Sequence, residues 1–155
     1  MNFNYTPQEE LFLQMIREFA EKEVKPLAAE IDEEERFPIE TVEKMSKLGL
    51  MGITIPKEYG GAGATNQIYT MAVEELSRVC ATTGVVVSAH SSLCCDPIMF
   101  FGTPEQKERY LPRLASGEWI GAFGLTEPNA GTDAAGQQTF AVEEEDHYVL
   151  NGNKI

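Results

Sequence analysis

The sequence is poor in cysteine, histidine, tryptophan and basic residues. It holds three cysteines, two histidines and one tryptophan in 155 residues, and 12 basic residues stand against 25 acidic ones. Cys80, Cys94 and Cys95 are too few and too unevenly spaced for a disulfide framework, so we expect reduced thiols and a cytoplasmic protein. The net charge of −13 would repel phosphate backbones and anionic lipid surfaces. Binding to nucleic acid or to membranes is therefore not expected.

The scarcity of histidine and cysteine also limits metal chemistry. His90, Cys94 and Cys95 fall at positions i, i+4 and i+5 of an expected helix, so His90 and Cys94 could share a face. Zinc needs four ligands, or three and a water molecule, and His147 is distant in sequence. We predict no metal site and no cysteine nucleophile, because no base or orienting group accompanies the thiols. The simpler interpretation is a buried helix in which the cysteines pack as small apolar groups.

What is present is ordinary globular composition, with 43% hydrophobic and 24% charged residues. The first residues lack the basic start and apolar core of a signal peptide. The one apolar run long enough to cross a membrane, Val79 to Phe101, carries His90, Asp96 and Pro97. These polar and helix-breaking residues favour a buried core helix over a lipid-spanning one.

Helical periodicity dominates the first 116 residues. Thr6-Pro7-Gln8-Glu9 and Thr103-Pro104-Glu105-Gln106 both have the pattern of a capping box with proline in the first turn. Apolar residues recur at helical spacing behind each start. Proline 26 should break or kink the first helix, and Gly49 should end the second. The expected helices run from Thr6 to about Ile31, from Pro38 to Gly49, from Ile68 to Cys80, from Thr83 to Phe101 and from Thr103 to Gly117.

The character of the chain changes after Gly117. Trp119–Leu125, Thr139–Val142 and His147–Leu150 lack helical spacing and are predicted as strands. Asn151-Gly152 is typical of a two-residue hairpin turn, yet only three residues follow it. We therefore expect a mainly α protein with a β part: an N-terminal helical bundle domain over 1–116, then the first strands of an incomplete β domain over 117–155.

The segment from Gly121 to Gly136 is the strongest candidate for chemistry. It is a loop of small residues with two threonine hydroxyls and two acids. Small residues let backbone N–H groups approach a ligand closely, and consecutive amides can bind an anion. The residues alone leave two interpretations open, a phosphate or cofactor loop and an ordinary surface turn.

Four ordered motifs resemble the acyl-CoA dehydrogenase family and together span nearly the whole chain. Gly124–Gly136 meets every constrained position of that family's first signature. Its residues are similar to those of short-chain, butyryl-CoA-type members from anaerobic bacteria. The other three motifs are Ile55–Gly61, Phe101–Lys107 with Tyr110-Leu111-Pro112, and Leu150–Ile155. The resemblance implies a helical domain followed by a middle β-barrel domain.

The resemblance also implies a cofactor and its contacts. Family members use FAD to desaturate an acyl-CoA thioester, with a glutamate removing the α-proton and the β-hydride passing to flavin N5. Thr126 would contact the polar edge of the flavin ring, and Thr132 would touch both an FAD phosphate and the substrate. The cofactor-binding residues so implied are Phe123, Gly124, Leu125, Thr126, Glu127, Pro128, Asn129, Ala130, Gly131 and Thr132.

Further expectations come from the same resemblance. Electrons would pass to an electron-transferring flavoprotein, and the complete protein would be a homo-oligomer, a tetramer or a dimer. The segment Ser88 to Pro97 would border the acyl cavity, although plain core packing explains each side chain equally well. Glu127 is not the catalytic base, which we expect beyond Ile155, and we expect the 155 residues alone to be inactive. The alternative is a non-catalytic helical binding or scaffold module that keeps the fold.

Overall fold

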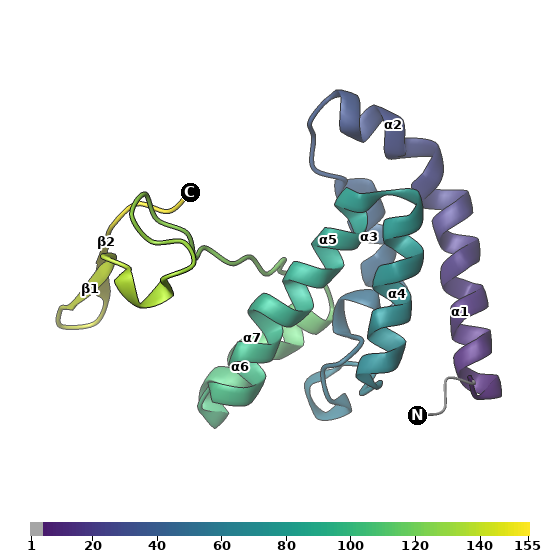
Figure 1. Cartoon of the computed structure of the whole chain (residues 1–155). Coiled ribbons are helices and arrows are strands. Elements are labelled where there is room, and N and C mark those ends of the chain that lie inside the picture. Colours follow the sequence, from purple (N-terminus) through teal and green to yellow (C-terminus); the bar gives the residue numbers. More distant parts are fainter. Residues whose placement is uncertain (1–4) are drawn as a thin grey trace. The chain divides into compact units, whose positions relative to one another are not determined.

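The structure is a computed structural model that describes residues 5–155. The chain forms two compact units that divide between Ala122 and Phe123, and each is described by itself. The first unit is helical and the second contains a small hairpin (Figure 1). The domain boundary after residue 116 stays a prediction from the sequence.

Among residues 5–155, seven α-helices make up most of the first unit (Figure 1). Two π-helical segments, η1 and η4, join four of them pairwise into two longer rods, α1 with α2 and α5 with α6. The short 3₁₀ turns η2 (Leu50–Gly52) and η3 (Lys57–Tyr59) connect α3 to α4. The other elements are α1 (Pro7–Phe19), η1 (Ala20–Val24), α2 (Lys25–Glu33), α3 (Ile39–Lys47), α4 (Asn66–Val79), α5 (Ala81–Ser88), η4 (Ala89–Cys95), α6 (Asp96–Phe101) and α7 (Pro104–Ala115).

The helix starts agree with the sequence prediction. The Thr6 hydroxyl accepts the Glu9 N–H at 3.2 Å, and the Glu9 carboxylate accepts the Thr6 N–H at 2.8 Å. Thr103 and Gln106 form the same reciprocal pair at the start of α7. Each capping box satisfies two N–H groups that the first helical turn would leave unpaired. Gly49 follows α3 with φ of +74°, a left-handed conformation that favours glycine.

Two prolines explain the π-helical segments. Pro26 is the second residue of α2 and Pro97 the second residue of α6, and each of these helices directly follows a π-helical segment. Proline has no N–H for the carbonyl four residues earlier, and its ring crowds that carbonyl. The preceding turn widens and the rod continues. The sequence predicted a break or kink at Pro26 and one uniform helix from Thr83 to Phe101, so the widening itself was missed.

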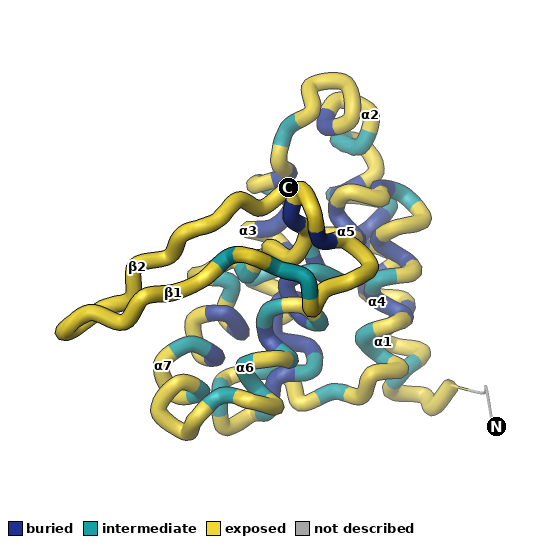
Figure 2. The backbone as a smooth tube through the Cα atoms, turned by 60° about the vertical axis from the view of Figure 1, so that its left-hand side comes forward, coloured by how far each residue is buried: buried dark blue, intermediate teal, exposed yellow. Residues whose placement is uncertain are grey.

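The core of the helical unit lies where α4 packs between α1 and α5. Ile16, Met45, Leu76 and Val87 are fully buried there, and a second cluster forms around Leu111 on α7. Figure 2 shows buried backbone along the inner sides of these helices. The run Ala81–Phe101 is long and apolar enough to cross a membrane by length and composition alone, a test that core helices also pass.

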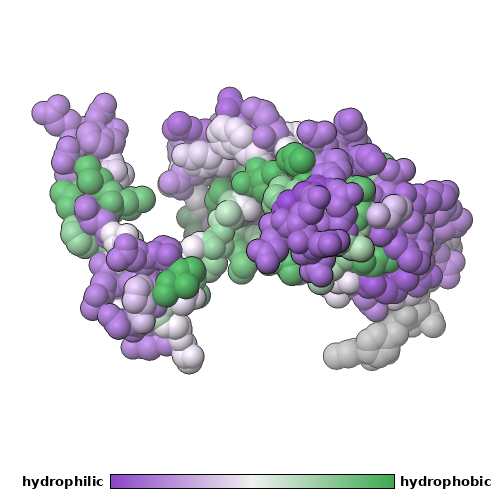
Figure 3. All heavy atoms as spheres, turned by 90° about the horizontal axis from the view of Figure 1, so that it is seen from above, coloured by the Kyte–Doolittle hydropathy of each residue, from purple (hydrophilic) through white to green (hydrophobic). Residues whose placement is uncertain are grey.

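The second unit holds one antiparallel hairpin. Strand β1 (Phe140–Glu143) pairs with β2 (Tyr148–Asn151), with Phe140 opposite Asn151 and Glu143 opposite Tyr148. These two strands confirm two of the three predicted ones to within about a residue. Large apolar side chains of the hairpin are exposed, and green atoms mark apolar surface in Figure 3.

One local prediction in this region was wrong, and another stays a prediction. Trp119–Leu125 is not a strand, because no segment among residues 5–155 forms a ladder with it. The hairpin turns at Glu144–His147, where the Glu144 N–H donates to the His147 carbonyl at 2.9 Å. Asn151-Gly152 follows the second strand, as expected from the sequence, and the hairpin turn predicted there stays a prediction.

Candidate cofactor site

The predicted cofactor-binding stretch forms one continuous loop at the start of the second unit. Of its ten residues, only Glu127 and Ala130 are buried. These two exchange backbone hydrogen bonds, Glu127 N–H to Ala130 O at 2.9 Å and Ala130 N–H to Glu127 O at 3.1 Å. Pro128 and Asn129 form the tip of the resulting tight turn. The other eight residues present their surfaces outward, where a ligand can reach them.

The carboxylate of Glu127 fastens the loop to the rest of its unit. One oxygen accepts the Gln138 N–H at 2.6 Å, and the other accepts the Thr139 N–H at 3.1 Å and the Lys154 ammonium at 2.9 Å. The side chain is 5% exposed. The carboxylate thus ties together the loop, the residues before β1 and the segment after β2.

The surroundings of Glu127 keep it ionised. The Lys154 ammonium, followed by the donors of Thr139 and Gln138, lowers the pKa of the Glu127 carboxyl to about 2. A carboxylate with that pKa, which already accepts three hydrogen bonds, does not take up a proton near neutral pH. Its negative charge is balanced by Lys154, so it does not repel an anion bound nearby. Sequence reasoning placed Glu127 in the cofactor loop but missed that its carboxylate points inward.

Backbone carbonyls on the other flank of the loop are also engaged. The Leu125 carbonyl accepts the Lys154 ammonium at 3.0 Å and the Gln137 side-chain amide at 2.6 Å. The Thr126 carbonyl accepts the Ile155 N–H at 2.9 Å. Lys154 and Ile155 therefore lie beside Leu125 and Thr126. These partners are 12 to 29 positions away in sequence, and no local pattern signals them.

The far end of the loop keeps its backbone donors free for a ligand. Within residues 5–155, the N–H groups of Gly131, Thr132 and Asp133 take part in no hydrogen bond. A Cβ at Gly131 would meet no atom within 4 Å, so the backbone there is open to close approach. Consecutive unpaired amides beside an exposed Thr132 hydroxyl suit the phosphate oxygens of a dinucleotide. The residues present fit the diphosphate of FAD.

His90, the alternative ligand considered from the sequence, is fully buried and committed to backbone partners. Its Nε2 lies 3.1 Å from the Met51 carbonyl, and its Nδ1 accepts the Gly121 N–H at 2.9 Å. Because the π-helical turn is wider than an α-helical one, Cys95 at i+5 also approaches the ring, with its sulfur 3.5 Å from Nε2. Among residues 5–155, no three His, Cys, Asp or Glu side chains gather around a common point.

Cys94 and Cys95, which lie near His90, are not suited to act as nucleophiles. Burial raises the pKa of the Cys94 thiol and raises that of the Cys95 thiol to about 12. Both thiols therefore stay protonated near neutral pH, whereas a nucleophilic cysteine needs its thiolate. This agrees with their interpretation as small packing groups.

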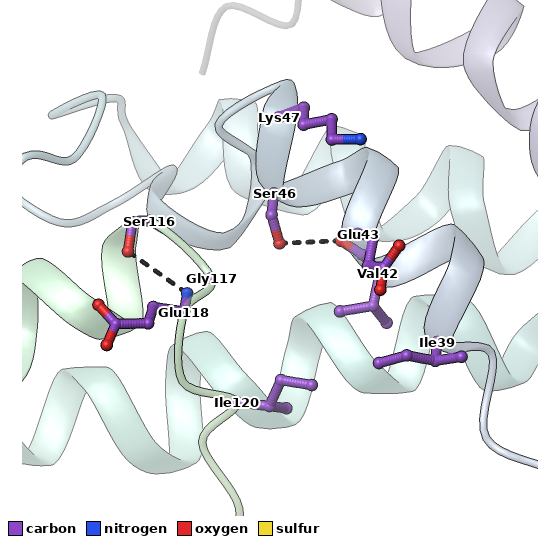
Figure 4. A pocket seen from close by; sticks show the side chains of 9 residues that line it. All are labelled: Ile39, Val42, Glu43, Ser46, Lys47, Ser116, Gly117, Glu118 and Ile120. Carbon is purple, nitrogen blue, oxygen red and sulfur yellow. Dashed lines mark hydrogen bonds between the residues drawn. The ribbon is translucent and has the colours of Figure 1, made fainter.

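The helical unit also has an open pocket of about 560 Å³ between α3 and the segment after α7 (Figure 4). Its hydroxyls are already bonded: Ser46 donates to the Val42 carbonyl at 2.9 Å, and Ser116 accepts the Glu118 N–H at 3.3 Å. Figure 4 shows Glu118 on the opposite side of the pocket from Glu43. Without converging polar groups, this pocket is a weaker candidate site than the loop.

A comparison with known families identifies the family of the chain. Residues 6–118 match the model of the acyl-CoA dehydrogenase N-terminal domain. The chain belongs to the acyl-CoA dehydrogenase family. The resemblance inferred from the four motifs is confirmed, and so is the predicted fold of a helical domain followed by the first strands of a β part.

Individual relatives are similar over nearly the whole chain. A short-chain-specific acyl-CoA dehydrogenase from Clostridium acetobutylicum is 64% identical over 155 residues, which are 100% of this chain and 41% of that protein. Butyryl-CoA dehydrogenase from Megasphaera elsdenii superposes with a TM-score of 0.92 at 43% identity, covering 100% of this chain and 42% of that one.

A third relative bears on the cofactor. An acyl-CoA dehydrogenase from Bacillus anthracis, solved in complex with FAD, superposes with a TM-score of 0.90 at 34% identity. The match covers 97% of this chain and 27% of that one. The chain thus spans well under half the length of the acyl-CoA dehydrogenases it matches.

Proposed function

We propose that this chain is the N-terminal part of an FAD-dependent acyl-CoA dehydrogenase that desaturates a short-chain, butyryl-CoA-type thioester. The observation that carries the proposal is the loop Phe123–Thr132. Its signature sequence is folded so that Glu127 is neutralised inside while the Gly131 and Thr132 amides remain available outside. The 64% identity to a short-chain-specific enzyme supports the acyl-chain class.

Different residues of the loop would contact different parts of FAD. The amides of Gly131 and Thr132 would bind its phosphates, and the Thr132 hydroxyl would add a hydrogen bond. Thr126, exposed and held by its carbonyl bond to Ile155, would offer its hydroxyl to the ring's polar edge. Phe123 and Leu125, which are 51% and 38% exposed, would cover apolar parts of the cofactor. Bound FAD supplies the electron acceptor for the desaturation.

Further parts of the proposal rest on the family resemblance and the sequence. Electrons would leave toward an electron-transferring flavoprotein, and the complete protein would be a cytoplasmic homo-oligomer, a tetramer or a dimer. The proton of the substrate would be removed by a residue other than Glu127, since a carboxylate with a pKa of about 2 and three donors is a poor base.

Anaerobic reduction of the purified complete protein tests the function. We expect a bound flavin whose absorbance bleaches on addition of butyryl-CoA, faster than with acyl-CoAs of eight or more carbons. A flavoprotein that stays oxidised with every acyl-CoA would refute the proposed activity. A protein that binds no flavin would support the alternative, a non-catalytic helical binding or scaffold module.

A further inference from the structure

The buried imidazole of His90 bridges two backbone segments that are far apart in sequence. Gly121 N–H can only donate, so Nδ1 must carry a lone pair and the proton must sit on Nε2. Nε2–H then donates to the Met51 carbonyl at 3.1 Å. Burial lowers the pKa of His90, which keeps this neutral form. Both ring nitrogens are therefore hydrogen-bonded: Nε2 to Met51 of η2, and Nδ1 to Gly121 in the segment after α7.

The segment after α7 lies directly against the π-helical segment at this point. A Cβ built on Gly121 would fall 2.5 Å from the Cys94 Cβ and 3.3 Å from His90 Nδ1. Only glycine allows so close an approach, and that approach brings the Gly121 N–H within reach of the ring. Outside this contact, the Trp119 N–H donates to the Arg113 carbonyl at 3.0 Å.

Gly121 lies two residues before Phe123, where the proposed cofactor loop begins. Residues 120–126 belong to no helix or strand, so no ladder fixes this stretch. The bond from Gly121 to His90 joins this stretch to the helical unit two residues before the loop begins. A fixed starting point reduces the freedom that the loop must lose when it closes on a ligand.

We propose that His90 is a positioning residue for the cofactor loop: its Nδ1 fixes Gly121 and thereby raises the affinity of the loop for FAD. The inference rests on the proposed function. It assigns a role in cofactor binding to a fully buried histidine. The sequence offered this residue as a metal ligand, as a core residue or as part of the segment expected to border the acyl cavity.

Two substitutions separate the two nitrogens of the ring. In His90→Asn the side-chain oxygen takes the place of Nδ1 and can still accept the Gly121 N–H. In His90→Gln the side-chain amide takes the place of Nε2 and can still donate to Met51. Both remove one buried hydrogen bond and change packing similarly, so each is the matched control for the other.

The FAD dissociation constants of the complete protein and its two variants are the first readout. We expect His90→Asn to stay within about twofold of the parent and His90→Gln to bind FAD about five- to tenfold more weakly, the effect of one hydrogen bond. Equal affinities in the two variants, or a loss confined to His90→Asn, would overturn the proposal. A parent protein without flavin affinity would instead refute the proposed function.

Hydrogen exchange of the peptide that contains Gly121 is the second readout, and it does not depend on FAD. We expect slow exchange at this amide in the parent and in His90→Asn, and faster exchange in His90→Gln. If His90→Gln does not fold, His90→Asn decides alone. Retained FAD affinity with a protected amide supports the proposal, and a tenfold loss of affinity overturns it.

Discussion

Replacing Glu127 by glutamine removes one charge from the loop without changing the size of the side chain. The carboxylate oxygens face only donors: the N–H groups of Gln138 and Thr139 and the ammonium of Lys154. A glutamine has one oxygen and one NH₂ group, so its NH₂ must point at one of these donors. Whichever way the amide turns, at least one donor loses its acceptor and a second contact loses its charge.

The loss should appear as weaker cofactor binding by the complete protein. A part-buried donor left unpaired costs on the order of one kcal/mol, so we expect the FAD dissociation constant to rise about fivefold to tenfold. Isothermal titration of the apoprotein with FAD measures this. Glu145→Gln, the same change on an exposed residue of the hairpin turn, is the control and should bind like the parent. If Glu127→Gln also binds within twofold of the parent, the carboxylate does not organise the loop.

Three further outcomes follow from the loop and from the segment Ser88 to Pro97. Because the folded pKa of Glu127 is lowered to about 2 and its unfolded value is about 4.3, its contribution is complete above pH 4.3 and is lost as the pH falls toward 2. Lys154→Met should move the acid release of FAD, followed by flavin fluorescence, to higher pH. Thr132→Val should weaken FAD or substrate binding by about 1.5–3 kcal/mol, and unchanged values for both would reject the assigned hydroxyl. Leu93 is 44% exposed, so Leu93→Ala should leave the melting temperature nearly unchanged. It should still shift the preference between butyryl-CoA and hexanoyl-CoA severalfold, at about 0.8 kcal/mol per CH₂. A flat preference would remove Leu93 from the acyl cavity.

Most of the helical architecture could be predicted from local patterns in the sequence. Thr6 and Thr103 begin helices because a capping box is complete within four residues, and Gly49 ends one because its left-handed φ needs no partner elsewhere. The hydrophobic spacing behind them identified buried residues such as Ile16 and Met45, but it also included Leu11 and Leu48, which are exposed. These features depend on neighbours in sequence, which is why they could be predicted.

What the sequence did not reveal depends on distant partners. Trp119–Leu125 has the composition of a strand, but strands also need a ladder, and none is formed within residues 5–155. The inward turn of Glu127 depends on Lys154, 27 residues away, and the role of His90 depends on Met51 and Gly121, 39 and 31 residues away. The π-helical widening had a visible cause in Pro97, but proline alone does not distinguish a widened turn from a kink.

The π-helical segment η4 sets the angular register between the two halves of the rod that runs from Ala81 to Phe101. An α-helix advances about 100° per residue, so deleting Ser92 and restoring α-helical winding would turn α6 by roughly that amount about its axis. Val87 on one half and Cys95 on the other are both buried now, and after such a rotation only one could face the interior. The spare residue in this segment therefore lets the two halves pack against different neighbours, with Val87 in one apolar cluster and Cys95 in the other.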